Sequence, residues 1–153
     1  MKRAAWSDPA AWSSLRDGTT CPICVRGFPL DVVAEGSATW ITAGREAPLP
    51  GYACVVSKRH VVEPFELPRD ERVAFWEEAM AAARAIADLY RPVKMNYEVH
   101  GNVVPHLHLH LYPRTPDDPY DTGGLAPRDA VFIREAEELT LLAAALRAAL
   151  STS

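Results

Sequence analysis

The stretch 96–114, NYEVHGNVVPHLHLHLYPR, is the most informative part of this chain. Its centre, residues 106–112, alternates polar and apolar side chains with period two, as a strand with one buried face does. The leucines then face the core, and His106, His108 and His110 share the other face. Three histidines are costly on a face that is merely solvated, because imidazole packs worse than Val or Thr and gains charge near neutral pH. We expect chemistry on this face, with a solvated histidine-rich surface as the alternative.

A single metal ion bound by all three histidines is a poor explanation. At about 3.3 Å of rise per residue, the first and third side chains start roughly 13 Å apart, whereas nitrogens on one zinc lie within about 4 Å of each other. At least one imidazole therefore remains for another task. A free imidazole can act as a nucleophile, acid or base near pH 7.

The motif resembles the signature of the histidine triad (HIT) superfamily of nucleotidyl hydrolases and transferases. Three histidines separated by apolar residues are preceded here by Gly101-Asn102 and followed by Pro113-Arg114, and both flanks match the family. The segment 55–60, VVSKRH, also resembles the family's strand that ends in Pro-Lys-Arg-His. The resemblance covers about residues 21–114.

The resemblance implies an α+β fold, an antiparallel β-sheet meander with one long helix, and a nucleotide-phosphate hydrolase or nucleotidyl transferase. In that family role, His108 attacks a phosphorus and forms a phosphoramidate, which water or another acceptor resolves. His110 would donate to the leaving oxygen or to a phosphoryl oxygen. Asn102 matches the amide that contacts the reacting phosphate in relatives, and Arg114 is a further candidate contact. Asn96 is another, with a structural role at the strand edge as its alternative.

Cys21 and Cys24 form a Cys-x-x-Cys pair, a spacing that recurs in zinc sites and in redox pairs. The flanks do not show the βαβ context of a redox motif. In some relatives such a pair binds zinc together with the histidine after Lys-Arg and the first histidine of the triad, which implies Zn²⁺ on Cys21, Cys24, His60 and His106. Two thiolates and two imidazoles would close a structural site. A metal-free thiol pair is the main alternative, and His100 in place of His60 is another.

Composition limits the other functions. The chain has 153 residues, 48% of them hydrophobic and 24% charged, as in a globular protein of one domain. No apolar run is long enough to span a membrane, and the three cysteines fit a reducing compartment, so we expect a cytoplasmic protein. Cys54, inside an apolar strand, is interpreted as a core thiol. The net charge of −4 argues against nucleic acid as a partner, whereas a nucleotide or related phosphorylated small molecule needs only a local positive field.

Periodicity predicts three helices. A short helix begins at Asp8-Pro9 and ends before Gly18, and the last helix covers residues 135–150. The long amphipathic helix covers residues 68–90, and its predicted buried stripe consists of Val73, Trp76, Met80, Ala83, Ala87 and Tyr90. Strands are predicted at residues 31–34, 38–42, 52–57, 94–99 and 107–112, and the last two are expected to pair.

We divide the chain into an N-terminal arm with a short helix (1–20), a HIT domain (21–114), and a loop with a C-terminal helix that packs on the same domain (115–153). Relatives are commonly two-fold dimers, so we expect a homodimer. Phe75 and Ile86, which lie beside the main stripe of the long helix, are the residues expected to make the second contact.

Two departures from the family concern the substrate. Many relatives have Pro-Gly-His where this chain has Pro50-Gly51-Tyr52, and the ribose-binding Asp or Asn of relatives falls near Gly44. A nucleotide-type substrate remains the expectation, but base specificity does not follow. The alternative function is a zinc-stabilised nucleotide-binding protein with little or no turnover.

Overall fold

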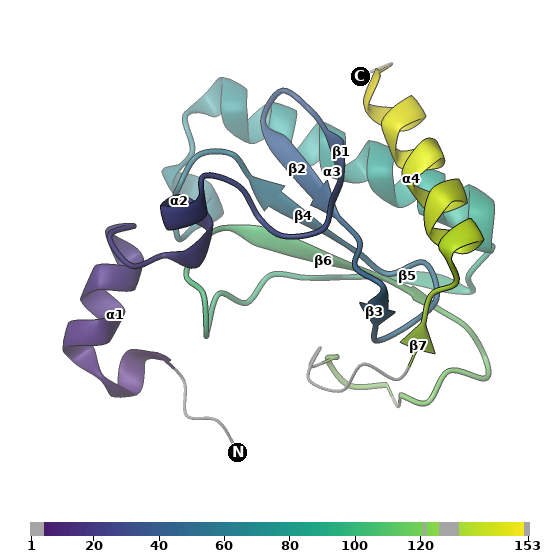
Figure 1. Ribbon diagram of the computed structural model, residues 1–153, viewed down its shortest axis with the longest axis horizontal. Coiled ribbons are helices and arrows are strands. Elements are labelled where there is room, and N and C mark those ends of the chain that lie inside the picture. The colour runs from purple at the N-terminus through teal and green to yellow at the C-terminus, as the bar shows by residue number, and fades with distance from the viewer. Residues whose placement is uncertain (1–4, 121, 126–131, 152–153) are drawn as a thin grey trace.

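A five-stranded antiparallel sheet forms the centre of the structure, with the order β1-β2-β4-β6-β5 (Figure 1). The computed structural model describes residues 5–120, 122–125 and 132–151. The start of the predicted N-terminal arm (1–4), parts of the predicted loop (121 and 126–131) and the last two residues lie outside the described residues. The strands of the main sheet are β1 (Val32–Glu35), β2 (Thr39–Thr42), β4 (Ala53–Ser57), β5 (Lys94–Glu98) and β6 (His108–Arg114).

The antiparallel α+β fold predicted from the sequence is confirmed. β5 and β6 pair as expected, with Glu98 opposite His110 and Asn96 opposite Tyr112. The long helix connects β4 to β5, which is the edge strand of the sheet. The chain then returns as β6, which lies between β4 and β5. β3 (Glu46–Ala47) and β7 (Phe132–Ile133) form a separate two-stranded sheet. Neither is among the strands predicted from the sequence, because strands of two residues have no measurable periodicity.

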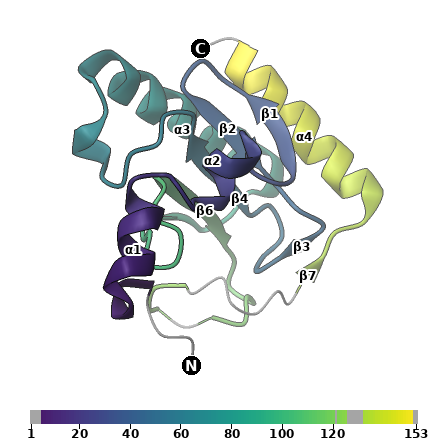
Figure 2. The ribbon, with the colours of Figure 1, turned by 60° about the vertical axis from the view of Figure 1, so that its left-hand side comes forward.

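Helices α3 (Arg69–Tyr90) and α4 (Ala136–Ser151) pack on each other and on the sheet (Figure 2). Their bounds agree with the predicted helices to within one residue. α1 (Pro9–Arg16) lies to one side of the sheet, and the Asp8 carboxylate caps it by accepting from the amides of Ala10 and Ala11 at 3.1 Å. The shorter elements are η1 (Ala5–Ser7), α2 (Pro22–Arg26) and η2 (Pro64–Glu66).

The buried face of α3 differs from the predicted stripe. Val73 and Met80 are 48% and 40% exposed, whereas Phe75 and Ile86 are fully buried in the core of the same chain. The assignment of Phe75 and Ile86 to a second contact is therefore wrong. Alternative apolar stripes exist on this alanine-rich helix, and only the packing against the sheet and α4 selects one of them.

The main core lies between the sheet and these two helices. Alternate strand residues supply it, and Ile41, Val55, Leu109 and Leu111 are almost completely buried there. The opposite face of the sheet carries His108, His110 and Tyr112 of β6, with Val56 and Cys54 of β4 beside them in register. We call this the histidine face. Cys54 is buried as predicted, but on the histidine face, and burial raises the pKa of its thiol to about 12.

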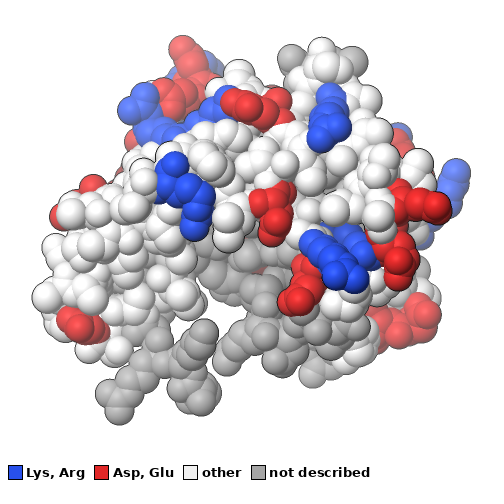
Figure 3. Space-filling view, in the orientation of Figure 1, with Lys and Arg blue, Asp and Glu red and all other residues white. Residues whose placement is uncertain are grey.

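Part of the histidine face is covered by loops. Tyr112, Leu49 and Leu125 form a small buried cluster there, with Tyr52 and Tyr120 packed against it. On the side of the molecule shown in Figure 3, basic and acidic residues are interspersed and form no continuous basic patch. Within the described ranges, none of the helices has the length and apolarity that a membrane crossing requires.

Candidate functional site

Four predicted ligands meet at one end of the sheet. Cys21 precedes α2 and Cys24 lies within it, because Pro22 begins a single helical turn that places both sulfurs on one side. His60 follows β4, and His106 precedes β6. One ligand atom from each of these residues lies within 4.8 Å of the other three. The chain thus brings together two thiols and two imidazoles from three separate segments.

The spacing of these atoms fits a tetrahedral ion. Cys24 Sγ lies 3.2 Å from His60 Nδ1 and 3.7 Å from His106 Nδ1, and the two Nδ1 atoms are 3.1 Å apart. Cys21 Sγ lies 3.6 Å from His106 Nδ1. Ligands bound to zinc at about 2.0 Å (nitrogen) and 2.3 Å (sulfur) are separated by roughly 3.3–3.8 Å in a tetrahedron. The four residues therefore fit a structural metal site.

The second nitrogen of each imidazole supports the same interpretation. His60 Nε2 lies 2.8 Å from the carbonyl oxygen of Arg16, and His106 Nε2 lies 2.7 Å from that of Ser57. A carbonyl oxygen can only accept, so both rings carry their proton on Nε2 and direct a lone pair from Nδ1 toward the thiols. Metal-binding histidines are commonly oriented in this way.

The Cys24 thiol needs a nearby cation if it is to lose its proton. Loss of surrounding water, followed by the neighbouring Cys21 sulfur, raises the pKa of the Cys24 thiol to about 11. Cys24 therefore resists ionisation in the absence of a counter-charge. A divalent ion reverses this effect, because it binds thiolates directly.

His108 is oriented differently from His106. Its Nδ1 donates to the carbonyl oxygen of His106 at 2.6 Å, so the lone pair of the neutral ring lies on Nε2. Burial, followed by the charge on His100, lowers the pKa of His108 below 6.5 despite this hydrogen bond. His108 is therefore a neutral imidazole near pH 7, with a lone pair on the nitrogen that points away from its own backbone.

His110 lies further along the same face. Its Nδ1 is 2.8 Å from the Tyr52 hydroxyl, and its ring stacks on Tyr112 with the centroids 5.8 Å apart. The rings of His108 and His110 meet edge to face at 4.9 Å. Burial, followed by the charges on His108 and His100, lowers the pKa of His110 to about 3. His110 is thus also neutral at physiological pH.

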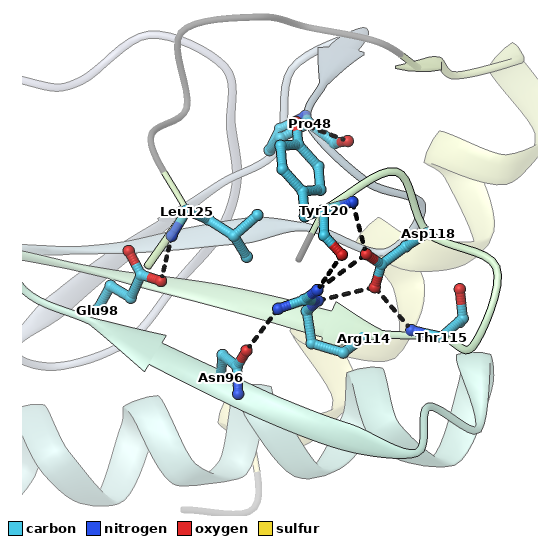
Figure 4. Close-up of polar contacts among 8 residues, drawn as sticks. All are labelled: Pro48, Asn96, Glu98, Arg114, Thr115, Asp118, Tyr120 and Leu125. Carbon is cyan, nitrogen blue, oxygen red and sulfur yellow. Dashed lines mark hydrogen bonds and ion pairs between the residues drawn. The ribbon is translucent and has the colours of Figure 1, made fainter. Parts of the chain in front are cut away.

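Asn96 and Arg114 lie at the other end of the histidine face (Figure 4). The Arg114 guanidinium donates to both carboxylate oxygens of Asp118 at 2.7 and 2.9 Å, and to Asn96 Oδ1 at 3.1 Å. It also donates to the carbonyl of Tyr120, so it holds the loop that follows β6. A pocket of about 430 Å³ opens here, lined by Lys94, Asn96, Arg114, Tyr120 and Thr122.

Asn102, by contrast, is exposed in the turn between β5 and β6. Its backbone carbonyl accepts from the amide of Ala5 at 3.0 Å, which joins this turn to the N-terminal arm. His100, the alternative metal ligand, instead bonds Glu98 Oε2 through Nε2 at 2.8 Å, and its ring centroid lies 6.1 Å from that of His110.

Sequence reasoning missed two further residues near the site. In the sequence, Tyr52 is recognisable only as a departure from the family pattern, yet its hydroxyl lies 2.8 Å from His110 Nδ1. Arg134, from the predicted loop, is buried and donates to the backbone carbonyls of Gly44 and Tyr52. In the sequence Arg134 is recognisable only as an arginine just before a helix. Arginines are mostly exposed, so the sequence does not predict that this one is buried.

Comparisons with known proteins agree with this fold. A search among curated proteins gives no match. The chain resembles solved structures of histidine triad proteins from Bradyrhizobium japonicum (23% identity, TM-score 0.65, covering 78% of this chain and 89% of that one) and Marinobacter aquaeolei (23%, 0.67, 79% and 88%). It also resembles a zinc-bound histidine triad family protein from Mycobacterium smegmatis (22%, 0.62, 88% and 98%). The HIT domain model matches residues 28–117, more than half of the chain, and the chain therefore belongs to the HIT domain family.

Proposed function

We propose that the protein is a nucleotide-phosphate hydrolase or nucleotidyl transferase that works through a phosphoramidate on His108. The observation that carries the proposal is the hydrogen bond from His108 Nδ1 to the His106 carbonyl, which leaves the Nε2 lone pair available. HIT family membership supports nucleotide binding and hydrolase-type chemistry in general.

The proposed reaction has two displacements at phosphorus. In the first, His108 Nε2 forms a bond to phosphorus while the bond to the leaving group breaks, and His110 supplies a proton or a hydrogen bond to that group. In the second, water or another acceptor attacks phosphorus, the N–P bond breaks and its electron pair returns to Nε2. A neutral imidazole serves both steps, because it is a good nucleophile and a good leaving group.

We assign a structural zinc ion to Cys21, Cys24, His60 and His106. Four protein ligands leave no open coordination position, so the ion would stabilise the fold rather than activate the substrate. The ion would connect the α2 segment to the end of β4 and to the start of β6, the two strands that carry the histidine face. The zinc-bound Mycobacterium smegmatis relative supports this assignment.

The substrate contacts fall into two groups. We assign Asn102 and His110 to the reacting phosphate. Arg114 lies four residues beyond His110 on the same strand, roughly 13 Å away at about 3.3 Å per residue. We therefore assign Asn96 and Arg114 to a distal part of an extended substrate such as a dinucleoside polyphosphate, in the pocket that they line.

Asp31 is a candidate contact for the ribose. Relatives have their ribose-binding Asp or Asn near the position of Gly44. A Cβ atom on Gly44 would lie 2.9 Å from the Asp31 carboxylate, so the Asp31 side chain places an acidic group close to that position. A carboxylate accepts hydrogen bonds from two adjacent hydroxyls. Asp31 has φ +56°, a conformation that Asn also tolerates, so Asp31→Asn removes the charge without disturbing the backbone and should raise KM for nucleotides.

We also propose a cytoplasmic homodimer. Reduced thiols suit a reducing compartment. The exposed apolar residues Val73 and Met80 of α3, rather than Phe75 and Ile86, are the candidates for the contact between copies.

A substrate panel tests the function. The zinc-loaded protein is incubated with a fluorogenic nucleoside phosphoramidate, with dinucleoside polyphosphates, and with the nucleotides and phosphosugars that raise its melting temperature. We expect turnover by the wild type and almost none by His108→Gly. Binding of nucleotides without turnover of any of these compounds would favour the alternative, a zinc-stabilised nucleotide-binding protein.

The metal has its own test. Cys24→Ala should lose zinc, as measured by elemental analysis, whereas Cys54→Ala should retain one ion per chain because Cys54 lies outside the ligand cluster. Zinc bound equally by both variants would contradict the ligand assignment.

A further inference from the structure

Arg134 is the largest side chain that the structure buries completely. It lies between β7 and α4, outside the segment that the HIT domain model matches. Among the described residues its Nε has no hydrogen-bond partner, and Glu138 Oε1 is 4.0 Å from it. Burying a guanidinium without a close carboxylate is costly, so this arginine calls for an explanation beyond packing.

The guanidinium joins the two ends of one loop. Nη1 donates to the carbonyl of Gly44 and Nη2 to the carbonyl of Tyr52, at either end of the segment that contains β3. The backbone reinforces this closure, because β7 pairs with β3 and the Arg134 amide donates to the Arg45 carbonyl at 2.8 Å. Arg134 therefore fixes the position at which the chain enters β4 through Tyr52.

Tyr52 links this part of the chain to the histidine face, because its side chain contacts residues there. Its ring lies 5.1 Å from that of Tyr112 and 6.0 Å from that of His110, and its hydroxyl is 2.8 Å from His110 Nδ1. A shift of Tyr52 along the strand would break this hydrogen bond. Arg134 and His110 do not bond each other, so any effect of one on the other passes through Tyr52.

The hydrogen bond also determines where the His110 proton lies. Burial raises the pKa of Tyr52 far above 10.0, so the phenol keeps its proton. A phenol is a good donor and a weak acceptor, whereas the bare nitrogen of a neutral imidazole is a good acceptor. Tyr52 thus donates to Nδ1, and His110 carries its own proton on Nε2.

We propose that Arg134 is a positioning residue of the site, which acts through Tyr52 to hold His110 with its proton on Nε2. His108 and His110 are then opposite tautomers on one strand face. His108 presents a lone pair at Nε2, and His110 presents an N–H group that can donate to a phosphoryl or leaving-group oxygen. The catalytic consequence rests on the proposed function, but the tautomer itself does not.

Nuclear magnetic resonance tests the tautomer directly. Two-bond ¹H–¹⁵N correlation spectra of the zinc-loaded, ¹⁵N-histidine-labelled chain distinguish protonated from bare ring nitrogens, and His110→Gln assigns the signals. We expect His110 of the wild type to be protonated on Nε2. Tyr52→Phe and Arg134→Met should each populate the Nδ1-protonated form and lower the turnover number, by about 100-fold for Tyr52→Phe.

A double variant tests whether Arg134 acts on His110 through Tyr52. If Arg134 acts through Tyr52, adding Arg134→Met to Tyr52→Phe should change neither the tautomer ratio nor the turnover number much further. Arg147→Met is the matched control, because Arg147 of α4 also donates to a backbone carbonyl, that of Val33 at 2.7 Å, but on β1. Arg147→Met should leave the His110 spectrum and the turnover number unchanged, whatever its effect on stability.

The outcomes are distinct. An unchanged His110 spectrum in Tyr52→Phe or in Arg134→Met overturns the proposal, and so does an equal change in Arg147→Met. If Arg134→Met does not fold, Arg134→Lys, which keeps the charge but cannot join both carbonyls, replaces it. If the tautomer shifts as expected but the protein has no turnover, the positioning role is supported and the proposed function is rejected. If the protein turns over substrate but the tautomer does not shift in the variants, the proposed function is supported and the positioning role is rejected.

Discussion

His106 and His108 are two residues apart, yet the structure gives them different partners. His106 directs Nδ1 toward Cys24 Sγ at 3.7 Å, while His108 donates from Nδ1 to the carbonyl oxygen of His106 at 2.6 Å. His106 lies just before β6 begins, where the Ser57 amide still donates to the Leu107 carbonyl but the Leu107 amide donates to the carbonyl of Val61. The Ser57 carbonyl instead accepts from His106 Nε2. This local departure from the strand turns the first imidazole toward the metal ligands and leaves the second on the sheet face.

The two histidines should therefore respond differently to substitution. His106→Ala opens the metal site, so we expect loss of zinc and about 3 kcal/mol of stability, or a melting temperature lower by roughly 6–12 °C. His108→Gly removes no metal ligand and should keep one zinc per chain and near-native melting, while covalent turnover falls by about 10³-fold or more. Elemental analysis, thermal melting and initial rates measure these effects.

Rapid quench provides the control for this comparison. The wild type should trap a phosphoramidate and His108→Gly should not. Loss of zinc from His108→Gly, or retention of most of its rate, would show that the roles are not divided in this way.

The pH dependence of the chemical step follows from the burial of His108. Because burial lowers the pKa of His108 below 6.5, the neutral nucleophile persists at neutral pH and is lost only as the pH falls through that lowered pKa. We expect single-turnover rates on a substrate of fixed ionisation to have an acid limb with its midpoint below 6.5. His100→Gln removes a positive charge that opposes protonation and should move the midpoint slightly upward. A midpoint at or above pH 7 would argue against attack by this imidazole.

Glu78 provides a test of the fold that is independent of the site. This carboxylate on α3 accepts from Ser37 Oγ at 2.5 Å, from the Ser37 amide at 2.7 Å and from Thr39 Oγ1 at 2.6 Å, and so closes the β1–β2 turn. Glu78→Gln should cost about 2–3 kcal/mol in urea unfolding at pH 7, because donors at the turn lose a charged acceptor. Glu77→Gln, at the neighbouring position but outside this set of hydrogen bonds, should be nearly neutral.

The effect of Glu78 should depend on pH in one direction. Burial alone would raise the pKa of Glu78, but the hydrogen bonds from Ser37, Thr39 and Ala38 outweigh it and hold the pKa below 4.5. The ionised form therefore stabilises the fold above pH 4.5, and this contribution disappears as the pH falls through the lowered pKa. The stability difference between wild type and Glu78→Gln should shrink below pH 4.5, and a difference that grows there would refute this account.

The oligomeric state can be tested with Met80→Glu. A charge at this exposed position should dissociate a dimer that forms through Val73 and Met80, and light scattering should then give the 16.8 kDa chain mass instead of twice that value. The introduced carboxylate would lie one turn before Arg84, so the helix itself should not suffer. Leu89→Glu is the control, since Leu89 is similarly exposed at 43% but lies on the opposite side of α3. A wild-type protein that is already monomeric at micromolar concentration would contradict the proposed homodimer.

The features that depend on local pattern can be predicted from the amino-acid sequence. The alternation of residues 106–112 predicts a strand with a histidine face, and the proline and Asp8 cap predict the first helix. The metal site of Cys21, Cys24 and the two histidines follows instead from the resemblance to the HIT family. For the strand and the helix, neighbouring residues along the chain carry enough information, because strand and helix periods are short-range properties.

Features that depend on contacts between distant segments are visible only once the chain is folded. The folded structure buries the side of α3 that carries Phe75 and Ile86, because packing against the sheet and α4 distinguishes between stripes that the sequence leaves equivalent. Folding also brings Arg134 to the end of the loop before Tyr52, and Tyr52 to His110, across separations of 82 and 58 residues. No periodicity extends over such distances, so the tautomer of His110 is a property of the fold and not of its strand.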